Sequence, residues 1–251
     1  MSQITLRQLG WSTPDGNSLF EDFDLSVSRE RIGLVGRNGV GKSTLLKLIS
    51  GELLPKTGGA TVTGTLGVLQ QKVQIEPEET LADLFDVRKA FEILRRAEAG
   101  QASIDELADA DWTLEERMAA ALDRVGLDVR PDTPLCKLSG GQWTRASIAV
   151  VFFQAPDFLL LDEPTNNLDR MGREAVFNLI ANWKAGAIVA SHDRELLEHM
   201  DAIVEITSLG ATRYGGNWSH FRQQNQSSCK PRNTIWPTLK NTRPRSNEIL
   251  K

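Results

Sequence analysis

Three short apolar runs in this chain are each followed by polar or glycine-rich residues. They are Ile32–Val35, Phe158–Leu161 and Ala187–Ser191. Continuous apolar runs of this length are typical of strands that are buried on both faces of a sheet. Because α/β sheets bind ligands at the carboxyl ends of such strands, we expect the residues that follow these runs to form a site.

Other segments have the periodicity of helices and of half-buried strands. Alternation over residues 4–27 predicts strands joined by the turn at Thr13–Asn17. Helices are indicated over residues 44–49 and 143–153. Two helical faces are predicted between residues 71 and 138, one with Leu84, Val87, Phe91 and Leu94, and one with Leu114, Met118, Ala121, Leu122 and Val125, closed by Gly126.

The run GRNGVGKS, residues 36–43, fits the pattern G-x-x-x-x-G-K-S/T between a predicted strand and a predicted helix. Such a loop surrounds a phosphate with backbone N–H groups at a helix N-terminus. Lys42 would neutralise the β- and γ-phosphates, and the Ser43 hydroxyl would ligate Mg²⁺. The alternative is a chance glycine-rich turn, which the flanking elements disfavour. We expect the phosphate site to comprise Gly36, Asn38, Gly39, Gly41, Lys42, Ser43 and Thr44.

Two adjacent acids, Asp162 and Glu163, end the second apolar run. Asp162 can hold the Mg²⁺ shell while Glu163, on the opposite face, polarises the attacking water. The alternative is a pair of solvated acids at a strand end. His192 follows the third run, where a neutral imidazole can contact a γ-phosphate. A lone histidine is more often structural, and we interpret His199 and His220 in that way.

With LSGGQ at residues 138–142, the chain resembles the nucleotide-binding domain of ATP-binding cassette (ABC) ATPases over residues 3–222. It is most similar to the ABC-F group, which has no membrane domain. That resemblance is carried by DEPTNNLD (162–169), LVGRNG (34–39) and YGGNWSHF (214–221). It implies an α/β fold with a P-loop core, an antiparallel β-subdomain and a helical subdomain at about residues 76–150, within a domain of residues 1–224.

The resemblance also implies roles for further residues. Gln71, with Gln70 as the alternative, matches the glutamine that senses Mg²⁺ and the attacking water. Asn167, Leu168 and Asp169 match the D-loop that touches an opposing domain. The signature residues Ser139, Gly140, Gly141 and Gln142 would grip ATP bound to a different cassette domain. A small-residue loop that opens a helix offers N–H donors to an anion, which agrees with this role.

The expected function is Mg²⁺-dependent ATP hydrolysis at a site shared with a second nucleotide-binding domain or a head-to-tail homodimer, in a ribosome-associated role. The alternative is the ATPase subunit of an ABC transporter, docked on a membrane permease through an apolar groove near Gln71. A third outcome is a domain that binds nucleotide without completing a task. The aromatic residue that stacks on adenine is not placed, since Thr13 takes its position and Trp11 lies nearby.

Composition agrees with a cytoplasmic protein. The formal charge is −4 over 251 residues, so no global basic field favours nucleic acid. Cys136 and Cys229 fit neither a disulfide framework nor a metal site. The first residues lack a signal-peptide pattern, and no apolar run has membrane-spanning length. We expect the acidic stretch over residues 105–116 to be a solvated face, and the alternative is a contact with a partner.

Residues 225–251 break the pattern, because they contain three prolines and six basic residues without an apolar period. This composition is typical of disorder. Permitted codons for residues 226–241, read in a shifted frame, encode a sequence with helical period. We therefore hypothesise that the reading frame shifted near Gln224 and left a lone first domain with an aberrant tail. The nucleotide sequence tests this.

Overall fold

A mixed sheet of six strands organises the computed structural model, which describes residues 2–69, 76, 78–166, 168–207 and 210–228. The strand order is β5-β6-β7-β3-β8-β9, and β9 alone among these runs antiparallel to its neighbour. The strands are β3 (Arg31–Val35), β5 (Leu66–Val68), β6 (Phe158–Asp162), β7 (Gly186–Ala190), β8 (Ala202–Thr207) and β9 (Gly210–Gly215).

The three apolar runs form the centre of this sheet. β7 lies between β6 and β3, with Leu159 opposite Ala187 and Ile32 opposite Ile188. All five residues of β7 are buried. The prediction of strands buried on both faces is therefore confirmed, and the parallel pairing brings their carboxyl ends to one edge of the sheet.

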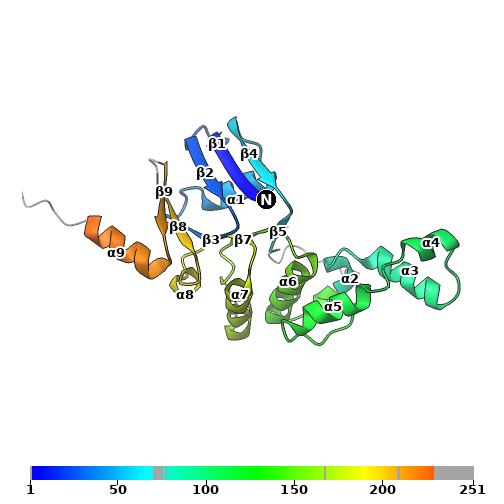
Figure 1. Cartoon of the computed structure of the whole chain (residues 1–251). Helices are drawn as coiled ribbons and strands as arrows, with labels where there is room; N and C mark the ends of the chain where they lie inside the picture. The colour runs from blue at the N-terminus through cyan, green and yellow to red at the C-terminus, as the bar shows by residue number, and fades with distance from the viewer. Residues whose placement is uncertain (1, 70–75, 77, 167, 208–209, 229–251) are drawn as a thin grey trace, which may run out of the picture.

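A second sheet covers one face of the first. It has three antiparallel strands in the order β2-β1-β4, with β1 (Gln3–Ser12), β2 (Ser18–Val27) and β4 (Thr57–Thr63). Figure 1 shows it above the central sheet, with α1 (Lys42–Ser50) between them. The turn of Thr13 is closed by a hydrogen bond from its N–H to the carbonyl of Asn17 (2.9 Å), as the sequence pattern predicts.

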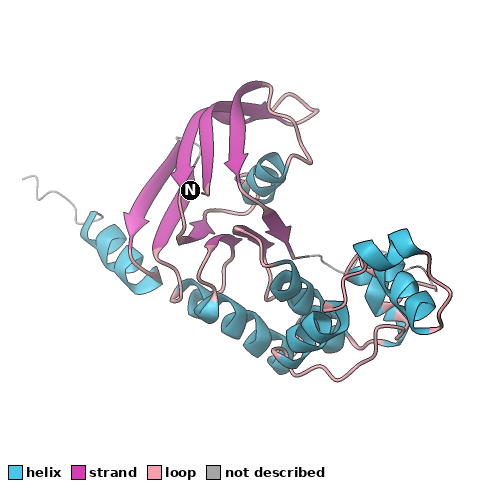
Figure 2. Cartoon of the chain, turned by 45° about the vertical axis from the view of Figure 1, so that its right-hand side comes forward, coloured by secondary structure: helices cyan, strands magenta, loops and turns pink. Residues whose placement is uncertain are grey.

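Helices α6 (Gly140–Gln154), α7 (Arg170–Asn182) and α8 (Arg194–Leu197) cover the other face. Alternate residues of β6 serve the two sides. Phe158 and Leu160 belong to the core beneath the three-stranded sheet, whereas Leu159 and Leu161 belong to the core against the helices. Figure 2 shows the resulting layers of strands and helices. The expected fold class is confirmed.

A third apolar core holds four of the helical segments between β5 and α6. These are α2 (Leu81–Leu84), α3 (Arg88–Glu98), α5 (Leu114–Asp123) and the short 3-10 helix η1 (Leu135–Lys137). α4 (Ile104–Asp109) lies outside this core, and its Ile104 is 85% exposed. The helical face predicted from Leu84 to Leu94 is divided between α2 and α3, because Asp86 adopts a left-handed φ of 57°. Gly126, at φ 61°, follows α5 as expected. The division into subdomains stays an interpretation.

The run YGGNWSHF turns β9 into α9 (Trp218–Ser228). The rings of Tyr214 and Phe221 meet edge to face with centroids 4.9 Å apart, and the N–H of Gly216 donates to the carbonyl of Asp201 (2.9 Å). The Arg31 guanidinium bonds both oxygens of Asp201 and holds the pKa of that carboxyl below its ordinary value.

α9 includes residues 225–228, beyond the boundary expected at residue 224. Residues 229–251, including Cys229, lie outside the described residues, so the tail and frameshift predictions stay open. Over the part of the chain that is described, no helix has the length and apolar character needed to cross a membrane.

Candidate functional site

The glycine-rich loop begins where β3 ends, and it leads into α1. Gly41 is the N-cap of α1 and has a left-handed φ of 106°. A Cβ at this position would lie 2.7 Å from Cζ of Phe20, a buried ring of the three-stranded sheet. Glycine is therefore needed for the backbone angle and for the close approach of the second sheet. The first turn of α1 presents its N–H groups without a side-chain cap, which suits an anion.

Lys42 lies under this loop and is only 7% exposed. Its Nζ lies 3.0 Å from the carbonyl oxygen of Gly36 and 3.3 Å from Nε2 of His192. A buried ammonium held by neutral groups keeps its positive charge uncompensated, and a phosphate would supply that compensation.

Glu163 and His192 meet Lys42 at the carboxyl edge of the sheet. Oε1 of Glu163 lies 3.4 Å from Nε2 of His192, and the backbone N–H of His192 donates to Oε2 of Glu163 at 3.3 Å. Glu163 adopts a left-handed φ of 45° while its N–H donates to the carbonyl of Ala190 (2.8 Å). Residues in such sparsely populated conformations cluster at functional sites, so this backbone angle supports Glu163 as a functional residue.

The Nε2 atom of His192 thus lies between a cation and an anion. It accepts a hydrogen bond from Lys42 when the ring proton is on Nδ1, and it donates toward Glu163 when the proton is on Nε2. A neutral imidazole does only one of these at a time. Its tautomer therefore depends on whether Lys42 is engaged elsewhere.

Three residues are expected to hold Mg²⁺: Ser43, Gln71 and Asp162. Ser43 is exposed in the first turn of α1 and Asp162 is the last residue of β6, whereas Gln71 lies outside the described residues. Among the described residues, no group of three or more His, Cys, Asp or Glu side chains is arranged to hold a metal ion. A hydroxyl and a carboxylate, with an amide oxygen expected from Gln71, suit Mg²⁺, which keeps water ligands and binds substrate phosphates. Gln70 and Gln71 lie outside the described residues, so their expected roles stay predictions.

The signature begins α6. Ser139 is its N-cap and forms a capping box, with the N–H of Gln142 donating to Oγ of Ser139 (3.2 Å) and the N–H of Ser139 donating to Oε1 of Gln142 (2.9 Å). Gly140 is exposed. A Cβ at Gly141 would lie 2.6 Å from Oδ2 of Asp169, so this glycine is packed against the carboxylate of the D-loop residue.

Asp169 also caps α7, because Oδ1 accepts from the N–H of Gly172 at 2.8 Å. Asn167 lies outside the described residues, and Leu168 packs against the core beneath α7. The contact of Asp169 with Gly141 was not predicted. The role implied for the D-loop toward an opposing domain stays a prediction.

Arg173 of α7 is a second residue that the sequence did not indicate. Its Nη2 donates to Oδ2 of Asp193 at 2.8 Å and lies 3.4 Å from Oε2 of Glu195. Asp193 caps α8 through the N–H groups of Glu195 and Leu196. Arg173 therefore ties α7 to the loop that carries His192. No sequence spacing signals this pair, since the two residues are 20 positions apart on different elements.

The remaining expectations concern residues away from the loop. The ring of Trp11 packs against the core beneath the three-stranded sheet, and Thr13 lies in the β1–β2 turn, so the adenine-stacking residue stays unassigned.

His199 lies near the ring of Phe177, with centroids 6.2 Å apart. In the acidic stretch Asp105, Glu115 and Glu116 are exposed, and Glu106 and Asp111 pair with arginines, as expected of a solvated face.

Comparison with known proteins gives a clear relationship. The family model described as ABC transporter matches residues 20–166. The tylosin resistance ATP-binding protein TlrC of Streptomyces fradiae is 32% identical over 82% of this chain and 43% of its own length. The energy-dependent translational throttle protein EttA of Mycobacterium tuberculosis is 30% identical over 77% of this chain and 38% of its own length. ABC transporter F family member 5 of Arabidopsis thaliana is 27% identical over 88% of this chain and 36% of its own length. The chain spans less than half of the length of these relatives.

Solved structures share the fold. The ATP binding subunit of an ABC transporter superposes with a TM-score of 0.69 at 21% identity, over 89% of this chain and 93% of that one. A dimeric ATP-binding cassette in a post-hydrolysis state, bound to ADP and Pi, superposes with a TM-score of 0.65 at 20% identity, over 84% and 98%. At these identities the likeness shows the fold alone.

The contact between Arg173 and Asp193 predicts a local change on mutation. Arg173→Ala removes a charge-assisted hydrogen bond, and at a partly exposed site we expect a loss of about 1 kcal/mol. Amide hydrogen exchange over residues 191–197 should therefore accelerate about fivefold. Arg170→Ala is the matched control, because it removes an i,i+4 pair with Glu174 from a side chain that is 91% exposed. Unchanged exchange in Arg173→Ala would contradict the link.

Proposed function

Because this chain belongs to the ABC transporter family of ATP-binding cassettes, we propose that it hydrolyses ATP with Mg²⁺ at the edge where β3, β6 and β7 end. One observation carries the proposal. Lys42 begins α1, Glu163 follows β6 and His192 follows β7, yet Nε2 of His192 lies 3.3 Å from Nζ of Lys42 and 3.4 Å from Oε1 of Glu163.

Each residue has a step that its position supports. Lys42 exchanges the carbonyl of Gly36 and the ring of His192 for phosphate oxygens. The carboxylate of Glu163 accepts a proton from the attacking water. Once Lys42 has turned to the phosphate, His192 carries its proton on Nε2. It then donates a hydrogen bond to the terminal phosphate or to Glu163. Ser43 and Asp162, with the expected Gln71, would hold Mg²⁺, which would supply neutralisation of the charge that develops on the phosphate oxygens.

The site needs a second domain for completion. The signature at Ser139 presents the N-terminus of α6, and we place its phosphate contact in the site of another cassette. One structural neighbour is a dimeric cassette bound to ADP and Pi, which supports this arrangement. Two chains packed head to tail would enclose two ATP molecules, each between one glycine-rich loop and one signature.

The proposed role is in translation, within the ABC-F group that the sequence resembles. The support is the translational throttle protein and the F family member among the relatives, together with the DEPTNNLD and YGGNWSHF runs. Membership of the ABC transporter family does not depend on this role.

Replacing Glu163 separates chemistry from binding. Glu163→Gln keeps the size and hydrogen bonding of the side chain but removes the base, so turnover should fall about 10²–10⁴-fold while ATP stays bound. Phosphate release and equilibrium binding of a fluorescent ATP analogue measure the two quantities. Hydrolysis at the parental rate would assign water activation to another group.

Mixing two inactive variants tests the composite site. Lys42→Ala disables the loop of one chain and Ser139→Arg disables the signature of the other, so their heterodimer retains one intact site. Each variant alone should be nearly inactive, and the mixture should regain activity that rises with protein concentration, since the two variants are separate chains that must associate. Concentration-independent turnover by a monomer, with no rescue on mixing, would refute the shared site.

Sedimentation tests the role in translation. The Glu163→Gln chain with ATP, in which closure persists because hydrolysis is slow, should co-sediment with ribosomes, and it should not do so with ADP. Lys42→Ala is the control for nucleotide dependence. Stable co-purification with a membrane permease, and no ribosome binding in either nucleotide, would favour the transporter alternative.

A further inference from the structure

Exposed apolar side chains gather on and beside α4. Among the described residues, six large apolar side chains are exposed, and three of them fall within residues 104–112. Ile104 is 85% exposed, Leu107 38% and Trp112 61%. Single exposed apolar residues are ordinary on a protein surface, but a group of three in so short a segment is typical of an interaction surface. We refer to these three residues as the α4 patch.

The α4 patch lies away from the nucleotide edge. Figure 1 shows α3 and α4 at the end of the molecule opposite α9. Ile104 and Leu107 are three positions apart on α4, so their side chains are neighbours on the surface of that helix. Trp112 follows the end of α4 by three residues. The patch is therefore open to a partner whether or not the nucleotide edge is occupied.

Local hydrogen bonds hold the backbone that presents the patch. Ser103 and Glu106 form a capping box at the start of α4, and Oε1 of Glu106 also lies 2.6 Å from Nη1 of Arg96 on α3. After α4, Oδ1 of Asp111 accepts from the N–H of Thr113 at 3.0 Å and closes the turn that carries the aromatic residue of the patch. A partner that covers a segment held in this way loses little binding free energy to ordering it.

Acidic residues surround the patch. Residues 98–116 contain seven Asp or Glu residues and no Lys or Arg. The arginines on either side, Arg96 and Arg117, each pair with an acid of this segment. Within the part of the chain that the structure describes, four further acids of the segment are exposed and form no ion pair: Glu98, Asp105, Glu115 and Glu116. The patch therefore lies in a field of negative charge.

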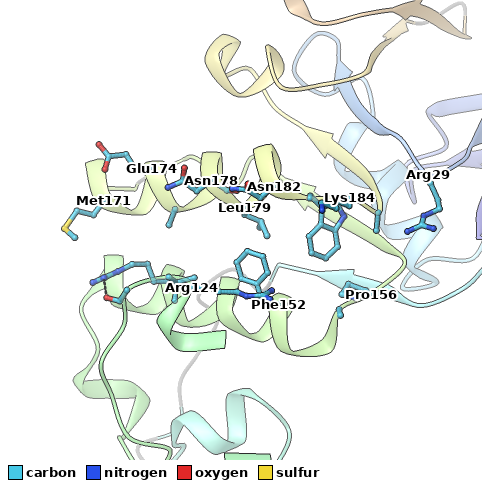
Figure 3. A pocket seen from close by; sticks show the side chains of 17 residues that line it. Arg29, Arg124, Phe152, Pro156, Met171, Glu174, Asn178, Leu179, Asn182 and Lys184 are labelled. Atoms are coloured by element: carbon cyan, nitrogen blue, oxygen red, sulfur yellow. Dashed lines mark hydrogen bonds between the residues drawn. The ribbon is translucent and has the colours of Figure 1, made fainter. Parts of the chain in front are cut away.

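The pocket between α6 and α7 is a poorer docking surface. Its volume is about 850 Å³, and Figure 3 shows Phe152 facing Leu179 within it. Leu179 is fully buried and Trp183 is only 9% exposed, so the chain itself already covers the apolar floor of this pocket. Because the hydrophobic contribution to binding scales with the apolar area removed from water, a partner gains more at the α4 patch.

We propose that the α4 patch binds a basic segment of a partner protein that carries both apolar side chains and Lys or Arg. The apolar side chains would cover Ile104, Leu107 and Trp112, while the cations would meet the unpaired carboxylates around them. A Lys or Arg of the partner can also stand over the exposed indole ring. Apolar burial supplies affinity, and charge complementarity selects basic over acidic segments. This proposal does not rest on ATP hydrolysis by the chain.

The charge of the segment disfavours the other classes of partner. The phosphates of RNA and the headgroups of anionic lipids bind Lys and Arg, and residues 98–116 offer neither. A second copy of this chain has a formal charge of −4 and brings no excess of cations. A basic protein segment is the occupant that the apolar exposure and the charge both favour.

Three short fluorescein-labelled peptides test the proposal, with fluorescence anisotropy as the measure of binding to the whole chain. The first is built from lysines and leucines, the second has glutamates in place of the lysines, and the third has serines in place of the leucines. The parent should bind the lysine–leucine peptide at least about tenfold more tightly than either of the others, because only that peptide meets both the acids and the patch.

Removing apolar surface tests the location. Ile104→Ala with Trp112→Ala should weaken binding of the lysine–leucine peptide at least about tenfold. Leu54→Ala with Met171→Ala is the matched control, because these side chains are 82% and 58% exposed at other places on the surface. The control should keep the parental affinity within about twofold.

Removing charge gives a second, independent variant. Asp105→Asn with Glu115→Gln should weaken binding of the same peptide about threefold or more at low salt. Glu21→Gln with Glu52→Gln makes the same change in net charge at exposed positions on β2 and after α1, and it should leave the affinity within about twofold. Thermal unfolding should be unchanged in all of these variants, because the substituted side chains are exposed.

ATP turnover should be unchanged in both variants of the patch, so this test and that of the ATPase fail separately. Equal binding of the three peptides, losses in the controls as large as those in the patch variants, or tighter binding of a short RNA than of the lysine–leucine peptide would overturn the proposal. Sedimentation velocity of the nucleotide-free parent supplies a further check. A dimer that Ile104→Ala with Trp112→Ala abolishes would assign the patch to a second copy of the chain and would also overturn the proposal.

Discussion

Burial of β7 on both faces is the constraint on which the rest of the structure depends. Every residue from Gly186 to Ala190 is buried, with hydrogen-bonded strands on either side and apolar cores above and below. Such a strand has no place for a polar side chain along its length. Polar chemistry is therefore confined to the loops beyond the strand ends, and the loops of β3, β6 and β7 come together because these strands are parallel neighbours.

α7 connects the parts of the candidate site. At its start, Asp169 caps the helix and packs against Gly141 of the signature. One turn later, Arg173 bonds Asp193, the neighbour of His192. A displacement of α7 would therefore change the contact of Asp169 with the signature and the contact of Arg173 with the histidine loop together, because charge-assisted hydrogen bonds are short and directional.

Much of the fold was predictable because it depends on local patterns. A continuous apolar run indicates a strand buried on two faces, and alternation indicates a strand buried on one face. The glycine-rich loop indicates backbone angles that other residues disfavour, and Gly41 adopts such an angle. The break between α2 and α3 was missed because Asp86 sits in an otherwise helical period, and the left-handed angle it adopts depends on how α2 and α3 pack in their core. The strands β8 and β9 were not predicted individually.

By itself, the sequence determined which residues follow the buried strands, and so which side chains reach the candidate site. Tertiary structure alone decided their pairing. Lys42 meets His192 across 150 residues of sequence, and Arg173 meets Asp193 between separate elements. The physical reason is that periodicity records whether a side chain is buried or exposed, whereas contact between two distant polar groups depends on the angles and distances at which whole elements pack.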